Sequence, residues 1–354
     1  MGSHDICLTM SAPLDVELDV TGKCQLDCTY CSAAPLMGAE IATEKAVSLI
    51  KNMGELGVFS LLVSGGEPTI HPGIVDIMRC ASQNIPSITM NTNGIRLANI
   101  SFAKRMHDAA PNAMFSISLD AVDAEVNNIH RGSGGAQAKT AIHNCLSLGQ
   151  LVNISCVLTE DNIDATYNIL DSYSDSVRRF SCFPRVPRSK DEISSANRAK
   201  LFWEKFNRFI EHFNAKYPPG GEIYVMLPFK RIQTDKRGGL FDYVEGCCCA
   251  YTRLYIDSAL NVYPCYYSAG PENLLGSCNN SILSEVWSGT SAGRLRERAS
   301  RECLCKVSFL SDEVPYRFSN SEHVSRMSKH EQLRSEAGEG WRALVWKNNS
   351  EANK

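Results

Sequence analysis

The chain has no long hydrophobic run, little net charge and no export signal. No apolar run reaches the ~18 residues that a membrane-spanning helix needs, and the N-terminus has no signal-peptide hydrophobic region. A formal net charge of −3 over 354 residues gives no electrostatic footprint for nucleic acid. Fifteen cysteines without an export signal argue against a disulfide framework and favour metal ligation in a reducing compartment. These absences predict a soluble, cytoplasmic protein with neither a nucleic-acid nor a membrane partner.

A further absence concerns the cysteines near the start of the chain. Cys24, Cys28 and Cys31 are separated by three and then two residues, and the next histidine and cysteine are His71 and Cys80. This spacing lets one loop bring three thiolates to an iron–sulfur cube, and a purely structural cluster or zinc site would normally have a fourth ligand nearby. Three thiolates leave the fourth iron of the cube without a protein ligand, and an open iron indicates a site that binds and reduces another molecule. For the triplet alone, a zinc loop completed from elsewhere is the alternative.

Three strand-like segments turn polar at their C-terminal ends. The apolar run at 61–64 predicts a buried parallel strand, and it ends in Gly65, Gly66, Glu67 and Pro68. The glycines allow backbone to approach a ligand closely, and Glu67 offers a negative charge to an amino group. Segments 88–94 and 114–120 end in Asn-Thr-Asn-Gly and Ser-Leu-Asp. Polar groups at such strand ends are typical of active sites in α/β barrels and open α/β sheets.

Together these motifs resemble the radical S-adenosylmethionine (SAM) enzymes. The resemblance spans residues 14–190, including the aromatic residue before the last cysteine of the triplet and the segment His130-Arg131-Gly132 after the Ser-Leu-Asp strand. As a combination, the motifs leave little room for the zinc alternative. The resemblance implies that Cys24, Cys28 and Cys31 hold a [4Fe–4S] cluster whose open iron binds SAM. Reductive cleavage of SAM would then yield a 5′-deoxyadenosyl radical that abstracts a hydrogen atom.

The resemblance also assigns contacts to SAM. The Gly-Gly-Glu turn would hold the methionyl amino group, the aromatic residue of the triplet would lie against the adenine, and the serine would face the ribose or carboxylate. The arginine would form a charge-assisted bond to the carboxylate. Simple barrel packing is the alternative for the aromatic residue and the serine, and a surface charge is the alternative for the arginine. The implied SAM-binding residues are Tyr30, Gly65, Gly66, Glu67, Asn93, Ser118, Asp120 and Arg131.

Strands and helices alternate through the first half. Strands are predicted at 14–20, 59–64, 87–91, 113–119, 152–158 and 178–183, with helices between them, for example at 43–56 and 136–148. Six βα units imply a parallel sheet with right-handed crossovers. The predicted fold class is α/β: a partial (β/α)6 radical SAM barrel, open laterally, followed by a small α+β auxiliary-cluster domain.

The predicted organisation has five parts. Residues 1–13 are an N-terminal extension, too short for the peptide-binding domain that some relatives carry, and 14–190 are the radical SAM core. Residues 191–243 are a helical linker, with an amphipathic helix at 197–217. Residues 244–310 form the auxiliary domain, and 311–354 are a polar tail.

The second half carries a separate metal signal. Cys247, Cys248 and Cys249 precede a hairpin-like segment at 255–263, a Tyr-Pro-Cys, a Leu-Gly-Ser turn, a short helix ending in tryptophan and a final cysteine pair. This order resembles the SPASM or twitch domain, which implies one fully ligated auxiliary [4Fe–4S] cluster suited to electron transfer or structure. The implied ligands are Cys249, Cys265, Cys303 and Cys305.

The match departs from the family in several places. Leu260 stands where the family hairpin usually has glycine, the final cysteine pair is spaced by one residue instead of two, and a second auxiliary cluster is not expected. Cys247 and Cys248 are either a hydrogen-atom donor or buried bystanders. Cys278 is a further candidate ligand.

Three functions are consistent with these features. The first is oxidation or cross-linking of a ribosomally made peptide by a radical SAM enzyme, with an electron donor such as flavodoxin or ferredoxin. The second is dehydrogenation or epimerisation of a sugar or aminocyclitol by the same radical start. The third is a non-catalytic iron–sulfur protein, which has no need of the Gly-Gly-Glu turn.

Overall fold

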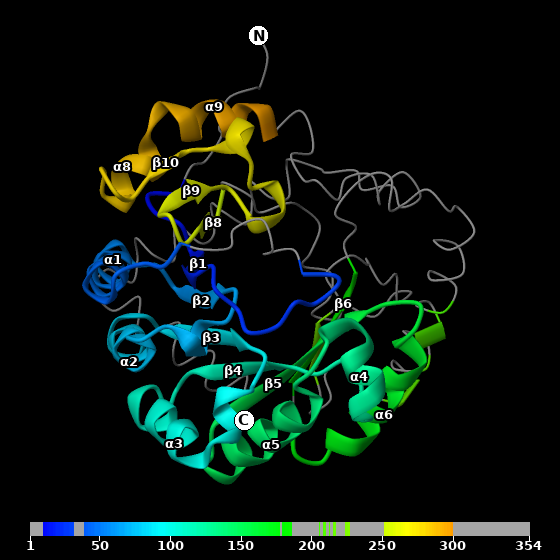
Figure 1. Ribbon diagram of the computed structural model, residues 1–354. Helices are drawn as coiled ribbons and strands as arrows, with labels where there is room; N and C mark the ends of the chain where they lie inside the picture. The colour runs from blue at the N-terminus through cyan, green and yellow to red at the C-terminus, as the bar shows by residue number, and fades with distance from the viewer. Residues whose placement is uncertain are drawn as a thin grey trace.

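A curved sheet with helices on its outer side organises the molecule (Figure 1). The computed structural model describes residues 10–31, 39–177, 179–185 and 251–299, with isolated helical positions between 205 and 216 and the short strand at 224–226. Six parallel strands follow one another in chain order. They are β1 (Asp15–Thr21), β2 (Ser60–Gly65), β3 (Ser87–Thr92), β4 (Met114–Ser118), β5 (Leu151–Leu158) and β6 (Arg179–Pro184).

Helices connect these strands along the outer side. They are α1 (Thr43–Leu56), α2 (Ile74–Asn84), α3 (Ile100–Ala109), α4 (Ala124–Arg131), α5 (Gly135–Ser147) and α6 (Ile163–Tyr173). All six predicted strands and both exemplified helices are confirmed, each to within about a residue or two at its ends. The predicted helix at 197–217 is represented by a few described positions, among them Phe209, which is fully buried against Tyr167.

The two faces of the strands differ in chemistry because successive side chains alternate. On the outer face, apolar residues of every strand pack with the helices in one core. On the inner face, the strand positions are mostly polar: Asn153 donates to Ser116 Oγ at 2.9 Å and accepts from Ser181 Oγ at 3.1 Å. A parallel strand covered on both sides would be apolar throughout. The alternation therefore indicates that the inner face lines a polar interior.

The C-terminal part of the described chain extends the same sheet. Strand β8 (Arg253–Ile256) pairs in parallel with β1, and β9 (Asn261–Tyr263) and β10 (Gly276–Ser277) add antiparallel strands beyond it. At the other edge, β7 (Tyr224–Met226) pairs with β6. The full order is β10-β9-β8-β1-β2-β3-β4-β5-β6-β7. The predicted hairpin and the predicted short helix, α8 (Leu283–Ser288), are both present, and α9 (Thr290–Ala299) follows.

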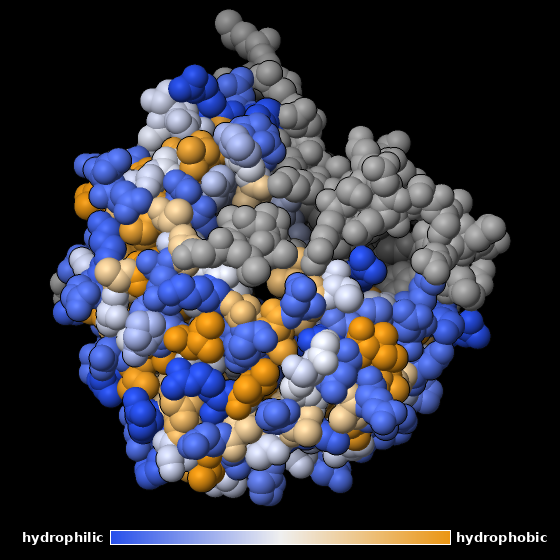
Figure 2. All heavy atoms as spheres, viewed as in Figure 1, coloured by the Kyte–Doolittle hydropathy of each residue, from blue (hydrophilic) through white to orange (hydrophobic). Residues whose placement is uncertain are grey.

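The outer surface carries no extended apolar belt on the face that Figure 2 presents, where hydrophilic residues predominate and apolar residues form separate patches. Among the helices of the described residues, none is long and apolar enough to cross a membrane.

Candidate functional site

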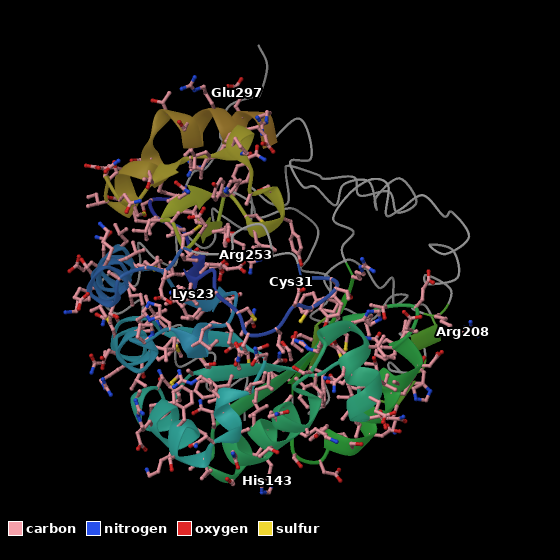
Figure 3. All side chains as sticks on the ribbon, viewed as in Figure 1. Lys23, Cys31, His143, Arg208, Arg253 and Glu297 are labelled. Atoms are coloured by element: carbon pink, nitrogen blue, oxygen red, sulfur yellow. The ribbon has the colours of Figure 1, made fainter. Side chains whose placement is uncertain are left out.

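The three cysteines of the triplet lie on the loop that leaves the C-terminal end of β1. All three are partly exposed, and Figure 3 shows Cys31 near the centre of the molecule. Within the loop, Cys31 N donates to Cys28 O at 3.0 Å, and Leu26 N donates to Cys24 Sγ at 3.4 Å. Burial raises the pKa of Cys28 to about 11, with a further contribution from the other two thiols. Metal binding must therefore displace protons from this loop.

The three thiols do not form a site for a single metal ion. Among the described residues, no three His, Cys, Asp or Glu side chains converge as ligands of one ion. A [4Fe–4S] cube does not require convergence, because each thiolate binds a different corner. The loop, with three partly exposed thiols that influence one another electrostatically, fits such a cluster.

The loop is held against β4 and α4. The Tyr30 hydroxyl donates to Asp120 Oδ2, and the Tyr30 ring lies 5.9 Å from the ring of His130. Thr29 N donates to His130 O at 2.8 Å. Tyr30 and Asp120 are both buried. The structure thus brings together the triplet, the end of the Ser-Leu-Asp strand and the His-Arg-Gly segment, as the motif order predicted.

Arg131 presents an unused donor at this point. Its side chain is buried, its Nε lies 3.7 Å from Asp120 Oδ2, and its Nη1 has no hydrogen-bond partner. Burial opposes its charge, but Asp120 and the other acidic groups around it, Tyr30 and Cys28 among them, together outweigh burial and raise the pKa of Arg131. A buried guanidinium N–H without an acceptor is costly. A ligand carboxylate beside the cysteine loop would satisfy it, so this group fits SAM.

Gly65 and Gly66 lie against the backbone that leads to Cys24. A Cβ at Gly65 would stand 2.2 Å from Thr21 O, and a Cβ at Gly66 would stand 2.3 Å from Lys23 O. Gly65 has φ +134°, which side chains disfavour. Gly66 N and Glu67 N donate to Thr21 O and Lys23 O, each at 2.8 Å. The close approach that these glycines permit is an approach to the base of the cysteine loop, and their contact with SAM stays a prediction.

Glu67 is buried and is the acceptor of several hydrogen bonds. Its carboxylate accepts hydrogen bonds from Thr69 N (3.1 Å), Thr69 Oγ1 (2.5 Å), Thr92 Oγ1 (2.7 Å) and Asn93 N (2.7 Å). A carboxylate has about four acceptor positions, so these donors account for its capacity. Burial still raises the pKa of Glu67. The observed role of this side chain is to fix the end of β2 to the end of β3, and its contact with an amino group stays a prediction.

Asn93 and Ser118 complete the predicted set. Asn93 Oδ1 accepts from Gln25 Nε2 at 3.4 Å, and its Nδ2 lies 4.0 Å from Cys24 Sγ. It therefore connects the Thr-Asn-Gly strand end to the cysteine loop. Ser118 is the last residue of β4, is partly buried, and pairs with Ser155 in the parallel register.

Two residues that contribute to the site, His130 and Asn127, were not among the predicted site residues. His130 lies between Thr29 Oγ1 (3.1 Å) and Thr159 Oγ1 (3.2 Å), and Asn127 Oδ1 accepts from Asp120 N at 2.9 Å. His130 stood within the His-Arg-Gly segment, so the motif was a signal for it. Asn127 gave no signal, because its partner is seven residues away across a loop.

Only one predicted auxiliary-cluster ligand is among the described residues. Cys265 is buried and follows β9. Cys249, Cys303 and Cys305 lie outside the described residues, as do Cys247 and Cys248. Cys278 is buried among core residues, and burial raises its pKa to about 11.

A partial parallel α/β barrel with a three-cysteine loop after its first strand defines the class of enzymes that cleave SAM reductively. Residues 18–172 match the model of the radical SAM superfamily. The matched residues, from β1 to α6, form a radical SAM domain, and a chain with this domain is a radical SAM enzyme. The family implies a [4Fe–4S] cluster and SAM as cofactors.

Known proteins with similar sequences cover most of the chain. Mycofactocin maturase MftC of Mycobacterium ulcerans is 26% identical over 82% of this chain and 79% of its own length. PqqA peptide cyclase of Streptomyces rochei is 28% identical over 78% of this chain and 76% of its own. The fold resembles that of Streptococcus suis SuiB, crystallised with the precursor peptide SuiA, with a TM-score of 0.64 and 16% identity over 81% of this chain and 67% of that one.

Proposed function

We propose that this enzyme oxidises or cross-links a ribosomally made peptide. The observation that carries the proposal is the similarity to PqqA peptide cyclase over most of both chains. The fold shared with SuiB, which binds a precursor peptide, is compatible with it. The partial barrel also supplies a polar inner face, on which Ser116, Asn153 and Ser181 form a hydrogen-bonded row.

In this proposal Cys24, Cys28 and Cys31 hold the SAM-binding cluster. When bound, the cluster and SAM supply a 5′-deoxyadenosyl radical that takes a hydrogen atom from a C–H bond. Arg131 orients a carboxylate through its unpartnered Nη1. Tyr30, Asp120 and the remaining predicted contacts position the loop and the strand ends around the ligand.

We also propose one auxiliary [4Fe–4S] cluster held by Cys249, Cys265, Cys303 and Cys305. The support comes from the hairpin: Leu260, five residues before Cys265, has a positive φ (65°) of the kind that favours glycine, and it stands where the family hairpin usually has glycine. The cluster would accept an electron from the substrate radical. A flavodoxin or ferredoxin would reduce the SAM-binding cluster, in the cytoplasm, where thiols stay reduced.

The first test is anaerobic reconstitution followed by reaction with SAM and a strong reductant. The intact protein should hold two [4Fe–4S] clusters and form 5′-deoxyadenosine. Changing Cys24, Cys28 and Cys31 together to alanine should leave one cluster and no cleavage, as measured by iron content and chromatography. Cleavage that survives in the triple variant would overturn the assignment of the catalytic site.

The second test concerns the auxiliary cluster. Cys265→Ala should lose about half of the iron and form no product, while uncoupled SAM cleavage persists at the first cluster. Cys145→Ala is the matched control, because Cys145 is a buried core cysteine of α5 that belongs to neither proposed ligand set. Full iron content in Cys265→Ala would show that the proposed ligand set is wrong.

A further inference from the structure

The inner face of β1 carries three carboxylates in alternate positions. Val16, Leu18 and Val20 belong to the apolar core, so Asp15, Glu17 and Asp19 point to the opposite, inner face. In the parallel register, Asp15 pairs with Arg253 and Glu17 pairs with Tyr255 of β8. Figure 3 shows Arg253 near the centre of the molecule. Negative charge thus accumulates along the strand that leads to the cysteine loop.

Asp19 is the member of this row nearest to the predicted chemistry. Its residue partner on β2 is Ser64, which directly precedes Gly65. It is 2% exposed, and its Oδ2 accepts from the Tyr255 hydroxyl at 2.6 Å. Its other oxygen, Oδ1, is buried without any hydrogen-bond partner. Leaving a buried acceptor unsatisfied is costly, so this oxygen is suited to a donor that the described part of the chain does not provide.

The neighbouring charges do not supply that donor. Arg253 lies opposite Asp15, which precedes Asp19 by four residues on β1. Asp257 is committed to its own hairpin, because it accepts from Ala259 N, Asn261 N and Asn261 Nδ2. Burial and the negative charge of Glu17 raise the pKa of Asp19 well above its ordinary range, and the Tyr255 hydrogen bond opposes this rise only in part. Burial likewise raises the pKa of Glu17. An incoming cation would relieve both carboxylates.

We propose that Asp19, with Glu17 beside it, forms an anionic subsite on the inner wall that binds a basic side chain of the substrate. The inference rests on the proposed peptide function and narrows it to peptides that carry a lysine or arginine at or next to the modified residue. Asp19 is a specificity-determining residue in this proposal, and Tyr255 positions its carboxylate.

The test compares three short synthetic peptides on the reconstituted enzyme with SAM present. They are acetyl-Gly-Gly-X-Gly-Gly-amide with X as lysine, ε-acetyl-lysine or norleucine, and binding is followed by fluorescence anisotropy of a labelled form. The unaltered enzyme should bind the lysine peptide at least about tenfold more tightly than the two neutral peptides, since a charge-assisted hydrogen bond exceeds 1.4 kcal/mol. Asp19→Asn keeps an acceptor for Tyr255 and should reduce that ratio below about threefold.

Asp15→Asn is the matched control, because it removes one negative charge from the same face of β1, four residues before Asp19. It should leave the ratio of lysine-peptide to neutral-peptide affinity unchanged. Glu17→Gln should lower the ratio by an intermediate amount and replaces Asp19→Asn if that variant does not fold.

The same three peptides, deuterated at the carbon atoms of residue X, provide a second measurement, because hydrogen abstraction from X would transfer deuterium to 5′-deoxyadenosine. Equal binding of all three peptides overturns the subsite but leaves the peptide function standing if deuterium is transferred. Absence of both binding and transfer for every peptide overturns both.

Discussion

Two buried carboxylates show how differently one kind of side chain is used in this molecule. Glu67 accepts from four donors of the chain and fixes the ends of β2 and β3. Within the described residues, Asp19 accepts from a single donor, Tyr255, and its Oδ1 has no hydrogen-bond partner. Burying a polar group is tolerated when its hydrogen bonds are satisfied. Glu67 therefore serves the fold, whereas Asp19 weakens it and keeps its capacity for a ligand.

The cost of burying Asp19 should be visible in how the stability of the protein depends on pH. The folded-state pKa of Asp19 is raised by burial, Glu17 and Asp257, so the folded protein holds a proton that the unfolded chain releases near pH 4. Stability should therefore fall as pH rises from about 4 toward the raised pKa, by at most about 1.4 kcal/mol per pH unit. Asp19→Asn should be more stable than the parent protein at pH 8, and the difference should shrink toward pH 5.5.

Chemical denaturation of the two proteins at both pH values measures this difference. Asn can still accept from Tyr255, so the comparison isolates the charge at Oδ1. A variant that is less stable than the parent at pH 8 would mean that the Asp19 carboxylate is stabilising, contrary to its unpartnered environment.

At the scale of elements, the hairpin between β8 and β9 depends on one strained residue. Leu260 has φ 65°, alone among the described non-glycine residues in having a positive φ, and its side chain is 5% exposed. The left-handed conformation costs a residue other than glycine about 1–2 kcal/mol. The turn is held by Leu260 N donating to Asp257 O at 2.8 Å and by the Asp257 carboxylate. Packing of the leucine side chain offsets the backbone strain.

At position 260, the glycine variant should be more stable than the alanine variant, which is the reverse of their usual order of stability. Leu260→Ala loses most of the side-chain packing and keeps the strain, so it should cost about 2–5 kcal/mol. Leu260→Gly loses the same packing but relieves the strain, and should be about 1 kcal/mol more stable than Leu260→Ala. Urea unfolding of both variants decides the order. An alanine variant at least as stable as the glycine variant would show that backbone strain at this position does not affect stability.

At the scale of the whole molecule, the described C-terminal elements and the barrel share one sheet. Strand β8 covers the edge of β1. Trp287 of α8 is buried and donates from Nε1 to Met10 O at 2.6 Å, and Arg296 lies over its ring at 4.2 Å. The segment therefore protects the strand from which the cysteine loop emerges. An uncovered edge strand exposes unpaired N–H and C=O groups and promotes association between chains.

Truncation tests this dependence. A chain that ends at residue 226 loses β8 to α9 and should aggregate or unfold at least about 5 °C lower, because β1 becomes an edge. A chain that ends at residue 299 retains these elements and serves as the control. Size-exclusion chromatography and thermal unfolding compare the two. A monomeric shorter chain as stable as the longer one would show that β8 does not support β1.

Prediction from sequence worked best where the signal was local. Alternation and turn residues predicted all six barrel strands, and the tryptophan-ended helix was predicted at α8. The triplet, Tyr30, Asp120 and Arg131 were predicted as one site, and the structure brings them together. The partners of Glu67 were not predicted, because Thr92 and Asn93 lie 25 and 26 residues further along the chain.

The sequence by itself determined the class of chemistry. A cluster needs thiols at a fixed spacing within one loop, and the order of the strand-end motifs is a property of the chain alone. Only the tertiary structure decided which buried carboxylate lacks hydrogen-bond donors. Tyr255 reaches Asp19 across 236 residues, and β8 lies beside β1 through a pairing that no local pattern specifies. Such contacts depend on which strands become neighbours, so the inner wall and its unpartnered carboxylate emerge only when the sheet has formed.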